Sequence, residues 1–238
     1  MKLHLAEPIM LRNFSKTKLT ILEYFFDFFI VSMFLVLLFV SLALGLYPEY
    51  SCLRTGFCDL RVVTEINGES TLISTMLLRT SVILLFVVLM MFFSVIMIFF
   101  QGKANTKYLS WIGTFFGLSQ GPINIIIFFE RGTFEFHMIF VIMGPILLNL
   151  AIIIYTIIYF LDGRVPKLNK YSFLVLAISA IVFSIIIGIA NSIGGSFNAQ
   201  TQRLGNTLFN YLSGITFIIQ GIVFFLITKK VKTTLDYK

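Results

Sequence analysis

Six long runs of apolar residues alternate with short polar connections along the chain. The runs cover residues 25 to 46, 77 to 100, 109 to 129, 138 to 160, 171 to 191 and 207 to 228. A helix needs about 20 apolar residues to cross the hydrocarbon core of a bilayer. The runs are continuous and rich in Ile, Leu and Phe, whereas the strands of a transmembrane barrel alternate over short segments. We therefore predict an all-α fold, a polytopic membrane protein with a bundle of six transmembrane helices.

The polar ends of the chain delimit one membrane domain. We expect a cytoplasmic N-terminal lead-in over residues 1–23, a six-helix transmembrane domain over 24–228 and a basic cytoplasmic tail over 229–238. One sizeable loop, 47–76, is predicted on the external side. The first apolar run is too long for a signal peptide and lacks a small-x-small cleavage site, so we expect it to be a retained span.

Composition and charge agree with a membrane location and indicate its orientation. With 58% hydrophobic residues, 12% charged residues and 28 phenylalanines, the 238-residue chain is too apolar for a soluble domain. Thirteen Lys and Arg residues fall at the termini and in the second and fourth connections, against four on the other side. By the positive-inside rule both termini are cytoplasmic. Because the basic residues are spread over four connections, we expect them to touch lipid headgroups and predict no nucleic-acid binding.

The chain's two cysteines, Cys52 and Cys58, lie in the 47–76 loop. The predicted topology places this loop in an oxidising compartment, where a disulfide between them would be structural. The alternative is a pair of unpaired thiols at the membrane surface. Two sulfurs without a nearby His or a second Cys pair do not form a zinc site. We predict no metal and no other cofactor.

The third span carries small and polar residues at helical spacing. Gly113, Gly117 and Gly121 recur every four residues, with Gln120 and Asn124 beside them. One face of this helix is therefore both smooth and able to form hydrogen bonds. Helix packing explains the glycines, but an amide left without a partner in hydrocarbon costs several kcal/mol.

A charged gap, FFERGTFEFHMIF at 128–140, separates the third and fourth runs. The six-span topology brings this gap to the same external depth as polar residues from other helix ends. The predicted ligand-binding residues are Glu65, Arg79, Asn124, Glu130, Arg131, His137, Asn206 and Asn210. The two arginines would hold an anionic group, His137 and the amides would orient it, and Glu65 would brace the loop. These residues can also be explained without a ligand. Arg79 can snorkel to the lipid headgroups, and Glu130 with Arg131 can form a solvated turn.

Several classes of enzyme are excluded by the residues present. The two histidines, His4 and His137, fall on opposite sides of the predicted membrane, which rules out a bis-histidine haem or multi-histidine zinc centre. There is no phosphate-binding loop and no dinucleotide fingerprint. His137 with Glu130 or Glu135 could act as an acid and base, but no nucleophile motif accompanies them, and we predict no catalytic residues.

Short motifs resemble those of the DRAM/Frag/Sfk-type superfamily of six-span membrane proteins, which includes related prokaryotic families of unknown function. The segment VVTEINGES is similar to the pattern that precedes that family's second span, and this similarity aligns Thr64, Glu65 and Gly68 with the residues of the pattern. The glycine-bearing third span and the turn after it resemble the same regions of the family. This resemblance aligns the family's histidine with His137. Two departures stand out: Asn67 is an extra residue before Gly68, and Asn210 stands where an acid is expected. The resemblance implies six helices with cytoplasmic ends and an association with lipid or membrane-trafficking processes.

Three functions follow as hypotheses. The first is a membrane protein whose external polar pocket binds a lipid headgroup or a membrane-protein partner. The second is a small-solute transporter or transporter subunit, which the prolines Pro122 and Pro145 and the central amides Gln120, Asn149 and Gln220 favour. The third is a lipid-modifying enzyme that uses His137 with a carboxylate.

Overall fold

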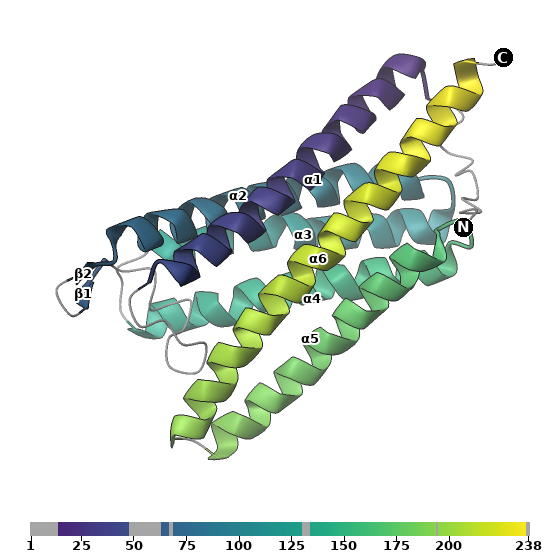
Figure 1. Cartoon of the computed structure of the whole chain (residues 1–238). Coiled ribbons are helices and arrows are strands. Elements are labelled where there is room, and N and C mark those ends of the chain that lie inside the picture. The colour runs from purple at the N-terminus through teal and green to yellow at the C-terminus, as the bar shows by residue number, and fades with distance from the viewer. Residues whose placement is uncertain (1–13, 48–62, 67–68, 130–133, 194, 237–238) are drawn as a thin grey trace.

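The part of the chain that the structure describes folds into six long α-helices and one small antiparallel pair of β-strands (Figure 1). The computed structural model describes residues 14–47, 63–66, 69–129, 134–193 and 195–236. The elements are α1 (Lys16–Gly45), β1 (Glu65–Ile66), β2 (Glu69–Ser70), α2 (Leu72–Ile96), the 3-10 turn η3 (Met97–Phe100), α3 (Ala104–Phe129), α4 (Phe134–Leu161), α5 (Lys167–Ile193) and α6 (Gly195–Asp236). The predicted all-α bundle is confirmed.

The helices pack in chain order and close into a ring. Each helix contacts the next one along the chain, and α6 returns to pack against α1. The start of α1 and the end of α6 lie at the same end of the bundle, together with the α2–α3 and α4–α5 connections (Figure 1). We call this the terminal end. The opposite end, which holds the antiparallel pair β1 and β2, is called the β-hairpin end.

Five helices are long and apolar enough to cross a membrane, so the chain is a polytopic membrane helical bundle. Within the described residues these spans are Lys16–Gly45, Leu72–Phe100, Met143–Leu161, Lys167–Ile186 and Thr207–Leu235. Helix α3 is not among these five. It carries Gln120 and Asn124 with glycines beside them, and Pro122 lies inside it.

The helices extend beyond the predicted apolar runs at most of their ends. α1 begins nine residues before the first run, where Ser15 caps it by accepting a hydrogen bond from the backbone N–H of Lys18 at 3.4 Å. α6 continues to Asp236 through the predicted basic tail. Charged residues are good helix formers, so a helix does not stop where its apolar face stops.

An aromatic core fills the half of the bundle next to the terminal end. Its rings touch one another in a continuous set, with neighbouring centroids 4.8 to 6.3 Å apart. The rings belong to Phe26, Phe29, Phe92, Phe93, Phe99, Phe100, Tyr155, Tyr159, Phe173, Phe217 and Phe224, all buried. Edge and offset contacts between aromatic rings add about 0.5–1.5 kcal/mol per pair beyond their area. This core packs the terminal half of the bundle densely.

Candidate functional site

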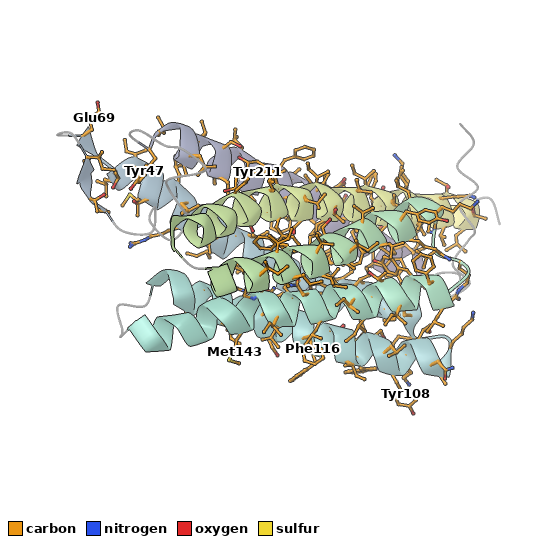
Figure 2. The ribbon with its side chains drawn as sticks, turned by 90° about the horizontal axis from the view of Figure 1, so that it is seen from below. Tyr47, Glu69, Tyr108, Phe116, Met143 and Tyr211 are labelled. Carbon is orange, nitrogen blue, oxygen red and sulfur yellow. The ribbon has the colours of Figure 1, made fainter. Side chains whose placement is uncertain are left out.

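Buried hydroxyl groups gather where the β-hairpin meets α2. Thr71 precedes α2, and its side chain accepts from the Thr64 backbone N–H at 2.8 Å and donates to the Thr64 carbonyl at 3.0 Å. The Ser74 hydroxyl donates to the Thr71 carbonyl at 3.3 Å. Thr71, Ser74 and Thr75 are at most 1% exposed. These bonds fix the hairpin on the start of α2 and place several hydroxyls at this end of the bundle. In Figure 2, Glu69 marks the far tip of this end.

Arg79 lies one helical turn beyond Thr75 and more than two turns beyond Thr71. It is half-buried, and it follows Thr75 by four residues and precedes buried Val82 by three. This spacing puts Arg79 on the side of α2 that packs against the rest of the bundle. A charged residue that faces inward within an apolar span usually marks a functional site.

Two amides on α3 form a buried pair two turns deeper. The Asn124 side-chain amide donates to the Gln120 carbonyl at 2.8 Å and to Gln120 Oε1 at 3.1 Å. Helix α4 approaches closely here, because a Cβ on Gly144 would lie 2.3 Å from Asn124 Oδ1. Only glycine fits at this position while Asn124 stays where it is. The smooth polar face predicted for the third span therefore packs on both neighbouring helices, since Gly113 meets α4 whereas Gly117 and Gly121 meet α2.

The structure describes the side chain of one more predicted residue, Asn210. It is exposed on α6, whereas Asn124 is buried between α3 and α4. Glu65 lies in β1, His137 near the start of α4 and Asn206 in α6, but their side chains lie outside the described residues, as do Glu130, Arg131, Cys52 and Cys58. The predicted pocket and the predicted disulfide therefore stay predictions.

A second polar network, which the sequence did not reveal, crosses the bundle within the aromatic core. Gln220 Nε2 donates to Ser172 Oγ at 2.8 Å and to the Asn169 carbonyl at 3.1 Å. Gln220 Oε1 accepts from Asn169 Nδ2 at 2.8 Å and from the Tyr159 hydroxyl at 3.2 Å. These bonds join α4, α5 and α6. The signal in the sequence was Gln220 itself, an amide in an apolar run, but its partners depend on helix order.

A second set of buried hydrogen bonds joins α2, α3 and α4, on the other side of the ring of helices. The Thr114 hydroxyl lies 2.7 Å from the Tyr155 hydroxyl and donates to the Phe93 carbonyl at 3.0 Å. Tyr155 also donates to the Ser110 carbonyl at 3.3 Å. Together with the aromatic rings around it, this contact fills the space between α2, α3 and α4 without a charged group.

The α4–α5 turn at the terminal end holds a buried carboxylate. Asp162 is 1% exposed and accepts from Arg164 Nε at 2.7 Å. A small cavity of about 20 Å³, room for a single water, lies beside it and is otherwise lined mainly by apolar residues such as Phe99 and Phe224. Burial alone would raise the pKa of Asp162, but the hydrogen bonds and charge of Arg164, with the charge of Lys103, outweigh it and lower that pKa. The pair is a structural feature of the turn.

Neither the described geometry nor comparison with known proteins assigns a reaction. No three His, Cys, Asp or Glu residues gather within metal-binding range in the described part of the chain. No protein-family model, curated protein or solved structure matches the sequence. The resemblance to the DRAM/Frag/Sfk-type superfamily therefore stays a prediction. What the described residues supply is an integral membrane helical protein with a polar β-hairpin end and an aromatic terminal half.

Proposed function

We propose that this integral membrane protein spans the bilayer six times, keeps both termini in the cytoplasm and binds an anionic lipid headgroup at its β-hairpin end. The observation that carries the proposal is the half-buried Arg79, one turn from Thr75 on the same side of α2 and near the β-hairpin end. A guanidinium is a donor that phosphate and carboxylate groups prefer. His137 and Arg131, predicted at the same depth, would complete the set.

Helix α3 is the sixth span of this proposal. Its 26 residues reach about 39 Å, longer than the hydrocarbon core. Its polar residues Gln120 and Asn124 are buried, while its exposed positions include Ile112, Phe115 and Leu118. A helix with this arrangement presents an apolar surface to lipid even though its average hydropathy is modest.

Two features of the terminal end support its cytoplasmic location. Basic residues cluster there, namely Lys16, Lys18, Lys103, Lys107, Arg164, Lys167, Lys170, Lys229, Lys230 and Lys232. Exposed aromatic side chains lie one or two turns further in, including Tyr24, Trp111 and Tyr171, and Figure 2 shows Tyr108 pointing away from the bundle. Aromatic residues of this kind mark a membrane–water interface, and a basic excess marks the cytoplasmic side.

The aromatic core argues against the transporter hypothesis. Phe93, Tyr155 and Phe217 pack with centroids 5.6 and 6.0 Å apart in the middle of the bundle. Rings at this spacing leave no room for a continuous water-lined path through the described core. Binding at one end suits this arrangement better than passage from end to end.

The test is native mass spectrometry of the full chain extracted with its own lipids. We expect an anionic lipid to be retained by the wild type and by the Lys107→Gln control, whose exposed lysine lies at the terminal end. Arg79→Gln should weaken retention at least about tenfold, since a charge-assisted hydrogen bond is lost. His137→Ala should weaken it as well. Equal retention by wild type and Arg79→Gln would reject the proposal and favour a protein partner at this end.

A further inference from the structure

Four buried polar atoms lack a hydrogen-bond partner among the residues that the structure describes. One, Asn169 Oδ1, belongs to the Gln220 network, and the other three lie nearer the middle of the bundle: Gln120 Nε2 on α3, Asn149 Oδ1 on α4 and Ser213 Oγ on α6. Gln120 is wholly buried. Leaving such a group without a partner costs about 1–3 kcal/mol each, so three of them in one region point to a ligand that satisfies them.

Gln120 and Asn149 lie at the same depth. Helices α3 and α4 are antiparallel neighbours, and Gly113 of α3 packs on Tyr155 of α4. Gln120 follows Gly113 by seven residues, and Asn149 precedes Tyr155 by six. Both therefore lie about two turns from this contact, in the direction of the β-hairpin end.

Ser213 lies within one turn of that depth. Helices α4 and α6 run in the same direction, and the Tyr159 hydroxyl bonds to Gln220. Asn149 precedes Tyr159 by ten residues, and Ser213 precedes Gln220 by seven. The difference of three residues amounts to about 4.5 Å along the helix axes.

Each of the three side chains lies on the same helix face as a residue that contacts another helix of the bundle. Seven residues bring a helix back to nearly the same face. Gln120 therefore shares the face of Gly113, which meets α4. Asn149 shares the face of Thr156, whose hydroxyl reaches the Phe173 carbonyl of α5 at 3.4 Å. Ser213 shares the face of Gln220, which bonds to α4 and α5.

We propose that Gln120, Asn149 and Ser213 form a neutral binding site in the middle of the bundle for an uncharged, hydroxyl-bearing group. A hydroxyl group can both accept and donate a hydrogen bond, which matches the unfilled donor of Gln120 and the unfilled acceptor of Asn149. The described segments at this depth, 113–124, 144–156, 173–184 and 207–217, contain no Asp, Glu, Lys, Arg or His. An ionic ligand would have no counter-charge there.

The surroundings limit the size and source of the ligand. Phe217 follows Ser213 by one turn and packs against Phe93 and Phe173, which closes the site toward the terminal end. Small, buried Ala180 lies on α5 at the depth of Asn149, seven residues beyond Phe173. The hydroxyl can belong to a neutral lipid such as diacylglycerol or to an aqueous polyol such as glycerol. This site uses none of the charged residues of the proposed headgroup site and stands apart from it.

The first arm of the test uses native mass spectrometry of the full chain in phosphatidylcholine nanodiscs that contain dioleoylglycerol. The matched variants are Ser213→Ala and Ser184→Ala, because the Ser184 hydroxyl bonds to the Ala180 carbonyl of its own helix at 2.8 Å. Gln120→Leu and Asn149→Leu remove the two amides. Wild type and Ser184→Ala should retain one dioleoylglycerol, and the other three should bind it about three- to tenfold more weakly.

The second arm measures the melting temperature of the detergent-solubilised protein with and without glycerol. A glycerol-induced rise that is larger in wild type and Ser184→Ala than in Ser213→Ala and Asn149→Leu would assign the site to an aqueous polyol. No retained dioleoylglycerol together with an equal glycerol effect in all variants would overturn the proposal.

Discussion

Lys232 near the end of α6 forms an ion pair with Glu23 of α1, with Nζ and Oε2 2.6 Å apart. The two side chains are only 23% and 18% exposed. The residues are 209 positions apart in the sequence, so the pair closes the ring of helices between its first and last members. It does so at the terminal end, next to the aromatic stack of Phe26 on Phe224.

Removing one partner of this ion pair should destabilise the bundle. We expect Glu23→Gln to lower the free energy of unfolding by about 1–2 kcal/mol, because the pair is shielded from water more than a surface pair. The double variant Glu23→Gln with Lys232→Met should recover part of the loss. Thermal unfolding of all four proteins in one detergent gives the coupling energy, and strictly additive losses would show that the two charges do not interact.

Gln220 should matter more, because it is the shared partner of three other side chains. Gln220→Leu leaves Asn169 Nδ2 and the Tyr159 hydroxyl without their shared acceptor in a buried place. We expect a loss of about 2–4 kcal/mol in the free energy of unfolding. Thr228→Val is the control, since the Thr228 hydroxyl bonds only within its helix, to the Phe224 carbonyl at 2.8 Å. Similar losses in both variants would mean that the network contributes little.

Close packing of α3 on α2 predicts a strong effect at one glycine. A Cβ at Gly117 would lie 2.3 Å from the Phe93 ring, which is held by Tyr155 and Phe217. Gly117→Ala should therefore cost about 1–3 kcal/mol of overpacking, against a gain of up to about 1 kcal/mol in helix propensity. A Cβ at Gly163 meets nothing within 4 Å, so Gly163→Ala should be neutral. The melting temperatures of the two variants test this prediction. An unchanged melting temperature for Gly117→Ala would show that α2 and α3 can move apart at little cost in free energy.

The sequence predicted the helices well because hydrophobic length is a local property. Four of the six apolar runs lie wholly within α-helices, while the first ends one residue after α1 and the second ends in the 3-10 turn η3. The small-residue stripe of α3 packs on its neighbours as its spacing indicated. Long-range partners could not be predicted in the same way. Pairing Glu23 with Lys232, or Asn169 with Gln220, requires the order of the helices in the ring and their relative depth, and neither is a local property of the sequence.

The candidate site was predictable only in part for a related reason. Arg79 and Asn124 stood out because polar groups in apolar runs need partners. The buried hydroxyls of Thr71 and Ser74 did not, since serine and threonine satisfy themselves on helix backbones and are common in membrane helices. Ser213 likewise looked like an ordinary packing residue until the depth of Asn149 and Gln120 was known.

Asp162 predicts a specific dependence of stability on pH. Because the folded state lowers its pKa, the carboxylate stabilises the fold above the ordinary pKa of about 3.9, and this contribution is lost as pH falls through the lowered value. The melting temperature of the wild type should therefore fall below about pH 4. Asp162→Asn should be less stable than the wild type at pH 7 and should lose much of the acid-dependent fall, because Arg164 then has no carboxylate in the turn. Glu69→Gln, which changes an exposed carboxyl at the β-hairpin end, is the control and should keep the wild-type profile. If Asp162→Asn follows the wild-type pH profile, another carboxyl is responsible for acid unfolding and the turn at 162–166 is held by its backbone hydrogen bonds and packing.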